Sequence, residues 1–275
     1  MAAAAACVSL PRLLSGAEAS GLDFPLVDLH VHLDNSTIEK VLPLSEKLKV
    51  KFGIVEHAGT KENIYPTVLS NDKELLERIA MLTGKGVYIG VQAEWTDWMR
   101  CFSKEALAKL DYVLTDTMTF PGKDGKRVKL WEAGVQDRVE MSNTQKFMDR
   151  YVDWHLEIIE KQPIDLLANV SWLPGPLSAE YDTYWTAARM KKVIAAFVDN
   201  KVAMEISSNF RLPKLKFLQA AKEAGVKFTF GSNGRYPNMG RLDYSIAMAR
   251  ELGLKATDMW TPAPDGQKAV QRRKW

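Results

Sequence analysis

Two histidines stand one residue apart at the end of an apolar run. The stretch LVDLHVHLDNS, residues 26–36, contains His30 and His32, and the chain has four histidines in all. Side chains two positions apart on a β-strand project from the same face, so both imidazoles can reach one point, as a divalent metal ion requires of its ligands. The alternative is a pair of buried core histidines. The nearby carboxylates of Asp28 and Asp34, which can hydrogen-bond the outer ring nitrogens, favour the metal site.

Other apolar runs also end in side chains that can carry chemistry. His57 ends the run FGIVEH, and Glu94 ends VYIGVQAE, where an unpaired buried carboxylate would be costly and a cation or ligand is expected. Asp116 follows DYVLT and is expected to be either a general base or a structural carboxylate that accepts bonds from the adjacent threonines. His155 differs, because it shares a helical apolar stripe with Met148 and is predicted to be structural.

Strands and helices alternate along the chain in a way that brings these side chains together. A parallel neighbour is reached only through a long crossover, so alternating elements predict a parallel sheet covered on both faces. No strand is followed by a glycine-rich nucleotide-binding turn, which favours a closed barrel over an open sheet, and in such a barrel the reactive groups lie at the carboxyl ends of the strands. Strands are predicted at 26–32, 52–57, 87–94, 111–118, 164–169, 202–207 and 226–232, and helices at 36–48, 72–82, 103–109, 143–161, 184–199, 213–224 and 240–252.

A family resemblance becomes visible at these positions. The segments DLHVHLD, GIVEH, DYVLTDTM, IDLLAN, GVKFTFGSNGR and MGRLDYSIAMARELGL, together with Glu94, resemble the PHP superfamily, the polymerase and histidinol phosphatase type of metal hydrolase. The resemblance covers about residues 26–260. It implies an α/β fold, a distorted (β/α)7 barrel similar to the TIM barrel, which binds up to three divalent ions and hydrolyses phosphate esters.

Part of the family's ligand set is retained. The resemblance places the HxH motif on His30 and His32, the second-strand histidine on His57 and the bridging carboxylate on Glu94. By this resemblance His30, His32 and Glu94 hold one ion, with the amide of Asn233 in place of a carboxylate. Imidazole and carboxylate ligands suit Zn, Mn and Fe alike.

Four positions depart from the family pattern. Met118 and Asn169 stand where the family has histidines, and Asn233 and Arg235 replace the closing Asp-x-His. A second ion would therefore lose both histidines and keep only Glu94. An arginine presents permanently charged donors that match phosphate or carboxylate oxygens, so Arg235 is expected to take over the electrostatic role of a missing ion on an anionic substrate.

Loops over the predicted barrel mouth supply further candidate substrate contacts. Trp95 and Arg100 lie in WTDWMR, and Trp172 lies on the proline-rich loop SWLPGP. Such aromatic side chains stack on sugar or base rings, although they also cover cores. With Arg235 and Asn169 they form the predicted substrate-binding set. The connection 119–142 is longer than a linker requires, and it is expected to be a loop that covers the pocket.

Composition excludes several classes of function. The chain has 275 residues, 46% hydrophobic and 26% charged, with a net charge of +3. This weak positive charge does not favour nucleic acid or an acidic membrane surface, and the expected partner is a small anionic molecule.

The two cysteines form no disulfide framework. The length fits one barrel domain, residues 23–260. Nothing in the pattern favours one oligomeric state over another.

The two ends of the chain differ from the barrel in composition. Residues 1–22 are rich in alanine and resemble the end of a secretory signal, which predicts a periplasmic or secreted protein. An alanine-rich leader on a cytoplasmic enzyme is the alternative. Residues 261–275 form a C-terminal tail, expected to be docked or frayed. No apolar stretch is long enough to span a membrane.

Three functions follow from these features. The first is a phosphoesterase-like hydrolase with one divalent ion, at most two, in which Asp116 or His57 moves a proton. The second is a barrel that has lost catalysis and binds an anionic or carbohydrate ligand through Arg235, Arg100 and the aromatic loops. The third is other metal chemistry, such as amide hydrolysis or a lyase step, because the fold does not fix the reaction.

Overall fold

The core of the molecule is a closed barrel of parallel strands. The computed structural model describes residues 21–275, and the predicted leader lies almost entirely outside this part. Strand β1 pairs with both β2 and β10, which closes the ring in the order β1, β2, β4, β5, β8, β9, β10. The strands span Val27–His32 (β1), Lys51–Ala58 (β2), Tyr88–Ala93 (β4), Tyr112–Thr115 (β5), Leu166–Leu167 (β8), Ala203–Ser207 (β9) and Phe228–Gly231 (β10).

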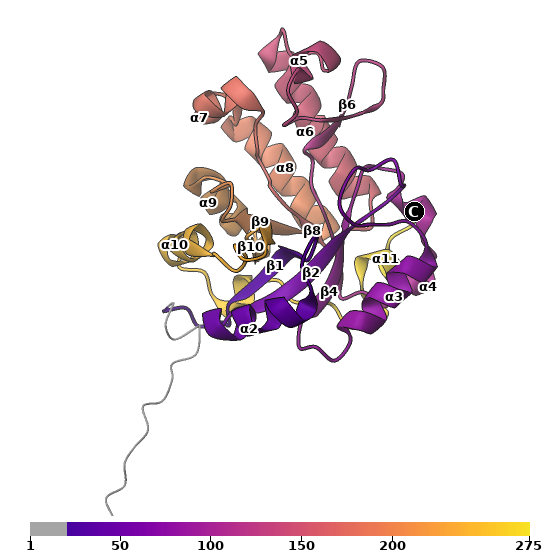
Figure 1. Cartoon of the computed structure of the whole chain (residues 1–275). Coiled ribbons are helices and arrows are strands. Elements are labelled where there is room, and N and C mark those ends of the chain that lie inside the picture. Colours follow the sequence, from indigo (N-terminus) through magenta and orange to yellow (C-terminus); the bar gives the residue numbers. More distant parts are fainter. Residues whose placement is uncertain (1–20) are drawn as a thin grey trace, which may run out of the picture.

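Helices surround the strands on the outside (Figure 1). Their apolar stripes bury against the barrel, as in the 18-residue α6, whose N-cap Asn143 accepts a hydrogen bond from the backbone of Lys146. No helix of the described residues is long and apolar enough to cross a membrane. The helices span Ile38–Leu48 (α2), Asp72–Leu82 (α3), Lys104–Leu107 (α4), Val135–Arg138 (α5), Thr144–Lys161 (α6), Tyr181–Tyr184 (α7), Ala187–Asn200 (α8), Leu215–Glu223 (α9), Asp243–Leu252 (α10) and Ala269–Arg272 (α11).

The barrel interior near the amino ends of the strands is filled by side chains. Tyr112 is buried there, and its hydroxyl donates to the carbonyl of Leu29 at 2.8 Å. Gly53 and Gly90 leave room for this ring, since a Cβ at Gly53 would lie 2.5 Å from the hydroxyl oxygen and one at Gly90 would lie 2.6 Å from the ring. The barrel interior is therefore filled at this level, and the polar side chains lie at the carboxyl ends of the strands.

An irregularity in β1 changes which residues face inward. Asp28 pairs with Phe52, but Val31 pairs with Ile54, so β1 uses one more residue than β2 between the two pairs. Leu29 packs in the lower interior cluster. The extra residue interrupts the alternation of inward-facing and outward-facing side chains. His30, which follows Leu29 directly, therefore also faces the barrel interior and contacts Glu205 and Gln92 there.

The predicted (β/α)7 barrel is confirmed. Residues 119–142, expected to form a loop, contain regular secondary structure instead. They form an antiparallel hairpin, β6 (Thr119–Pro121) with β7 (Arg127–Lys129), followed by α5. Arg127 fixes the hairpin with a hydrogen bond to Asn63 at 2.9 Å. Backbone pairing and this side-chain contact give the segment a structure that its length and composition did not reveal.

The remaining short elements extend the barrel. Strand β3 (Val68–Leu69) adds to β2, and β11 (Gly234–Arg235) adds to β1 beside the barrel mouth. Residues 261–275 pack against the body of the protein, where the ring of Trp275 stacks on Trp98 at 6.5 Å. Helix α11 contacts α4, so the tail is docked.

Candidate metal and anion site

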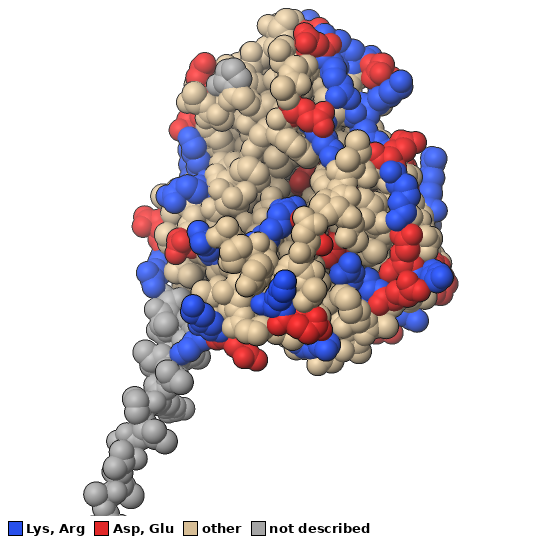
Figure 2. All heavy atoms as spheres, in the orientation of Figure 1, with Lys and Arg blue, Asp and Glu red and all other residues tan. Residues whose placement is uncertain are grey.

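A cavity of about 360 Å³ opens at the carboxyl ends of the strands. Its size is at the lower end of the range for small-molecule pockets. Figure 2 shows a hollow on this face of the molecule, with acidic atoms at its depth and basic side chains at its edge. The lining residues come from nearly every strand end and from the loops above: His57, Tyr65, Gln92, Asp116, Met118, Trp131, Asn169, Trp172, Phe210, Asn233 and Arg235.

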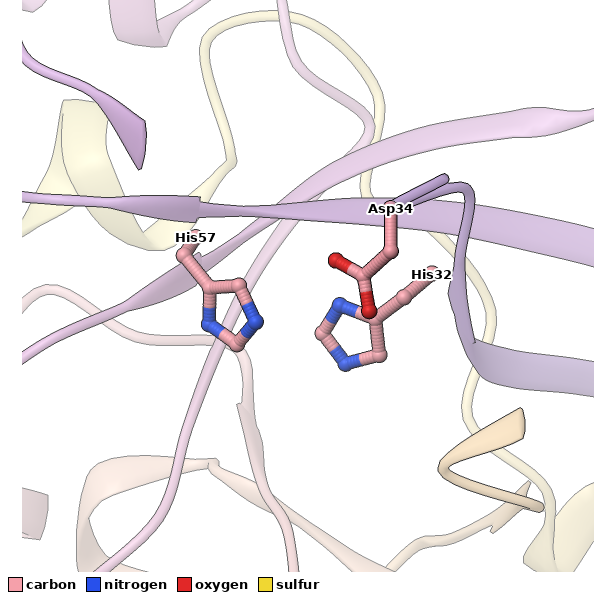
Figure 3. A group of neighbouring side chains, drawn as sticks. All are labelled: His32, Asp34 and His57. Atoms are coloured by element: carbon pink, nitrogen blue, oxygen red, sulfur yellow. The ribbon is translucent and has the colours of Figure 1, made fainter. Parts of the chain in front are cut away.

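His32, Asp34 and His57 form a group that could hold a metal ion. Each offers one ligand atom, and these atoms lie within 4.8 Å of one another. Figure 3 shows the three side chains pointing toward one another. Within residues 21–275, both nitrogens of His32, Nε2 of His57 and Oδ1 of Asp34 are buried without a hydrogen-bond partner. Buried polar atoms without partners are costly, and their convergence is what a cation site requires.

Burial keeps the two imidazoles of this group neutral. It lowers the pKa of His32 well below its ordinary value, and His57 and His30 lower it further. Burial likewise lowers the pKa of His57, to about 3. Neutral imidazole is the form that binds a metal, so both rings have lone pairs available near neutral pH.

Glu94 orients His57. Oε1 of Glu94 lies 2.8 Å from Nδ1 of His57, and Oε2 accepts a hydrogen bond from the hydroxyl of Tyr65 at 3.2 Å. Tyr65 also stacks on His57, with ring centres 3.6 Å apart. Burial raises the pKa of Glu94 to about 8, opposed by the charge of Lys129. Glu94 therefore contacts His57 directly, in a position from which a carboxyl group can orient an imidazole, and whether it binds a metal with His30 and His32 stays a prediction.

His30 forms a separate buried ion pair. Its Nδ1 lies 2.7 Å from Oε2 of Glu205, and its Nε2 lies 3.0 Å from Oε1 of Gln92. Burial by itself lowers the pKa of His30, but the Glu205 carboxylate outweighs this and raises the pKa above the ordinary value. Both ring nitrogens face acceptors, which suits the imidazolium form. The ring centres of His30 and His32 lie 5.2 Å apart, but of the two only His30 has both nitrogens engaged by acceptors.

Arg235 connects Asp34 to Asn233 at the rim. Its Nε donates to Oδ2 of Asp34 at 2.6 Å, and its Nη1 donates to Oδ1 of Asn233 at 2.8 Å. The amide oxygen of Asn233, expected as a weak metal ligand, is thus engaged by the guanidinium. The Arg235 side chain is 42% exposed. It can turn donors toward the cavity while it holds Asp34 in place.

Asp116 faces the cavity from the end of β5. Its Oδ1 accepts the backbone N–H of Met118 at 2.9 Å, and its Oδ2 accepts the side-chain amide of Asn169 at 3.3 Å. Burial raises its pKa to about 6, and the charge of Glu94 acts in the same direction. A carboxyl group that titrates near neutrality can exchange protons with a bound molecule. Met118 is buried at the cavity wall, where the resemblance implied a histidine.

Only part of the predicted substrate-binding set reaches the cavity. Trp172, Asn169 and Arg235 line it. Trp95 instead packs against Trp154, with ring centres 5.4 Å apart, and Arg100 is exposed beside it, outside the cavity lining. His155 lies in the core, hydrogen-bonded to the hydroxyl of Thr117 and to a backbone carbonyl.

A shared backbone feature presents the polar side chains at the mouth. Asp34, Asn169 and Asn233 each lie two residues beyond the end of a strand, and each has a positive φ, between 41° and 52°. Residues other than glycine rarely adopt this conformation, although Asp and Asn tolerate it. Such strain is concentrated at functional sites.

Sequence reasoning missed three members of the site. Gln92 is two residues before Glu94, so strand alternation would have placed it on the same inner face. Glu205 lies within β9, and no pattern in the sequence indicates its pairing with His30. Tyr65 lies in an irregular loop, and no pattern in the sequence indicates its stacking on His57.

Comparisons with known proteins agree with this architecture. No known protein-family profile matches the sequence, and no curated protein sequence matches it. Among solved structures, histidinol phosphate phosphatase from Lactococcus lactis subsp. lactis Il1403, solved with zinc, L-histidinol and phosphate, matches with a TM-score of 0.58. The identity is 14%, and the match covers 91% of this chain and 99% of that chain. The chain has the PHP-type barrel fold.

Two aldolases match less well. The HpcH/HpaI aldolase from Desulfitobacterium hafniense DCB-2 has a TM-score of 0.34 at 12% identity, over 78% of this chain and 88% of that one. Phospho-2-dehydro-3-deoxyheptonate aldolase from Thermotoga maritima has a TM-score of 0.32 at 14% identity, over 90% and 80%. At these scores the likeness does not bear on the fold, so the PHP-type barrel rests on the phosphatase comparison and on the closed ring of strands.

Proposed function

We propose that the protein is a metal-dependent hydrolase that acts on small anionic esters, with phosphate esters as the first class to test. The observation that carries the proposal is the convergence of buried ligand atoms without hydrogen-bond partners on His32, Asp34 and His57. Their position at the carboxyl ends of the strands is where barrel enzymes carry their active sites. The PHP-type fold, which a zinc-containing phosphatase shares, supports the same proposal.

One divalent ion per chain, Zn, Mn or Fe, fits this donor set of two imidazoles and one carboxylate. Such an ion would supply Lewis-acid polarisation of the ester group. Glu94 holds the ring of His57 with Nε2 free, and Arg235 holds Oδ2 of Asp34 so that Oδ1 is free. In this proposal Glu94 supports the ligand His57, and Asn233 supports the guanidinium of Arg235. His30 keeps its ion pair with Glu205 and is not a metal ligand.

Residues around His32, Asp34 and His57 are suited to binding the substrate and transferring a proton. Arg235 is exposed next to Asp34 and would bind the anionic group of the substrate. Asp116 would carry the proton to or from the leaving group, because burial brings its pKa to about 6. Asn169 holds the Asp116 carboxylate in position. The aromatic side chains of Trp131 and Trp172 would enclose the ester and leave room for the attacking water.

Metal content and turnover test the proposal together. Protein purified without chelators is expected to contain close to one equivalent of Zn, Mn or Fe and to hydrolyse an aryl phosphate. His32→Ala and His57→Ala are expected to lose both the metal and the activity. His155→Gln is the matched control, because this core histidine lies outside the cavity lining and should leave the metal content unchanged. Full metal retention in His32→Ala would contradict the site.

A second function has an observation in its favour. Met118 and Asn169 occupy positions where the resemblance implied ligands, and Arg235 places a fixed charge at the mouth. These replacements fit a barrel that binds an anionic or carbohydrate ligand without hydrolysing it. Metal-free purified protein that binds inorganic phosphate, and that loses this binding in Arg235→Ala, would favour the binding protein over the hydrolase.

A further inference from the structure

A second chamber adjoins the proposed site. It has a volume of about 790 Å³ and shares the side chains of Trp172 and Phe210 with the first cavity. These two rings meet edge to face, with centres 6.4 Å apart. A molecule seated against Arg235 could therefore extend past them into the second chamber. Its remaining lining residues are Leu173, Gly175, Ser178, Tyr181, Arg211, Leu212, Lys214, Leu215, Tyr244 and Met248.

The second chamber is basic and aromatic. Its lining contains Arg211 and Lys214 and no acidic residue. The guanidinium of Arg211 lies 5.1 Å from the ring centre of Tyr244, and the ammonium of Lys214 lies 4.4 Å from that of Tyr181. Lys214 also forms an exposed ion pair with Asp182, which lies outside the lining, at 3.7 Å. For Arg211 no ion pair or hydrogen bond is found among residues 21–275.

The loop that carries Phe210 and Arg211 is held in place by the backbone. Ser207 and Leu212 exchange both backbone hydrogen bonds, at 2.7 and 3.2 Å, and so close the loop at its base. The hydroxyl of Tyr244 donates to the carbonyl of Pro213 at 2.7 Å just beyond it. Arg211 has a φ of 56°, an unfavourable conformation that this frame maintains. The cation is thus presented by a fixed loop, which lowers the entropic cost of binding an anion.

We propose that the second chamber binds a second anionic group of the substrate, a phosphate or carboxylate at the end of the molecule opposite the reacting ester. This inference rests on the proposed function and narrows its substrate class. The substrate is then a small ester with an anion at each end and a ring or apolar spacer between them. The spacer lies against Trp172 and Phe210, and the distal anion lies between Arg211 and Lys214, where charge-assisted hydrogen bonds are strong.

Binding of non-hydrolysable probes tests the second chamber without requiring turnover. Alkyl bisphosphonates of increasing chain length are compared by calorimetry with alkyl monophosphonates of the same length on the purified protein. At the best length, the bisphosphonate is expected to bind roughly tenfold more tightly. Arg211→Gln and Lys214→Gln, which keep most of the side-chain stem, are expected to remove this advantage and leave monophosphonate affinity unchanged. Lys216→Gln, on an exposed position of α9, is the matched control.

The outcomes separate the two proposals. Equal affinity of the two probe classes at every length, or an advantage that survives in both glutamine variants, would overturn the second chamber. If the bisphosphonate advantage depends on Arg211 and Lys214 but no phosphate ester is turned over, the chamber stands and the hydrolase proposal fails. Turnover of an aryl phosphate in the same preparations, unaffected by Lys214→Gln, would show that these variants leave the reacting end intact.

Discussion

The contact between Glu94 and His57 decides which nitrogen of His57 is free. Nδ1 of His57 lies 2.8 Å from Oε1 of Glu94, so this nitrogen is engaged by the carboxyl group and Nε2 is the nitrogen left for a ligand. Nε2 is buried without a partner and belongs to the group with His32 and Asp34. A carboxylate behind an imidazole is the usual arrangement around ligand histidines in metalloproteins.

This relationship predicts a graded effect of substitutions at Glu94. Glu94→Ala is expected to weaken metal affinity by roughly 10-fold to 100-fold, because the His57 ring loses its orienting partner. Glu94→Gln should weaken it less, since the amide oxygen can still accept the Nδ1 proton. Metal affinity is measured by competition with a coloured chelator.

Tyr65→Phe is the matched control for Glu94. It removes the hydroxyl that donates to Oε2 and keeps the ring that stacks on His57. Its metal affinity is expected to stay close to that of the parent. Unchanged affinity in Glu94→Ala would contradict the orienting role.

A second prediction separates the ligand set of the structure from the set inferred from the sequence. Asp34→Asn replaces a carboxylate ligand with a weak amide and is expected to lower metal content sharply, measured by plasma mass spectrometry. His30→Gln is expected to keep the metal, because His30 is paired with Glu205 and Gln92. Loss of metal in His30→Gln with a folded protein would restore the HxH pair as the ligand set.

The sequence could predict some parts of the site and not others. Alternating apolar runs and helical stripes predict the barrel and place polar residues at strand ends, because each of these patterns is local. The choice between His30 and His57 as a ligand is not local. It depends on partners across the barrel, because Glu205 and Gln92 engage both nitrogens of His30, whereas Nε2 of His57 has no hydrogen-bond partner among residues 21–275. The strand alternation alone places His30 and His32 at one point.

Partners across the barrel are equally hidden from the sequence. Glu205 could be recognised as an acid at a strand end, yet its contact with His30 crosses the barrel interior. Tyr65 comes from an irregular segment, where no periodicity restricts the direction of a side chain. Residues 119–142 contain turn-forming residues, but the hairpin depends on Arg127 reaching Asn63 on another loop.

The pH dependence of stability can be predicted for His155, which lies in the core. Burial lowers its pKa from 6.5 to about 4, so the unfolded chain takes up a proton before the folded one does. Its contribution to stability is complete above pH 6.5 and is lost as the pH falls toward 4. The loss amounts to about 3 kcal/mol.

Urea unfolding at several pH values measures this contribution. At neutral pH His155→Gln is expected to be less stable than the parent, because the ring packs against Tyr151 and Trp185. The gap between the two free energies of unfolding should shrink by about 3 kcal/mol between pH 7 and pH 4. A gap that stays constant would show that the pKa of His155 is the same in the folded and the unfolded chain.

Gly231 makes room for the buried carboxylate of Glu205. A Cβ at this position would lie 2.2 Å from Oε2 of Glu205, so Gly231→Ala is expected to displace the carboxylate from His30 and to cost several kcal/mol. Gly84→Ala is the control: its Cβ meets nothing within 4 Å, and only the positive φ of 76° opposes it, at a cost of about 1 kcal/mol. Equal losses in thermal unfolding would contradict the steric argument.

The buried pair of His30 and Glu205 gives the sharpest stability test. The two side chains are 0% and 1% exposed, and their charged atoms are 2.7 Å apart. His30→Gln leaves the carboxylate buried without its countercharge and is expected to cost about 3 to 5 kcal/mol. Glu205→Gln leaves an imidazole whose pKa then falls with burial, so the ring loses its proton and the cost is smaller.

The double variant His30→Gln, Glu205→Gln carries no buried charge and is expected to be more stable than His30→Gln alone. Two amides can also hydrogen-bond each other in place of the ion pair. The coupling energy from the four free energies of unfolding is expected to exceed about 1 kcal/mol. Additive losses would mean that His30 and Glu205 do not interact as a charged pair, and His30 would then be neutral and available to a metal ion.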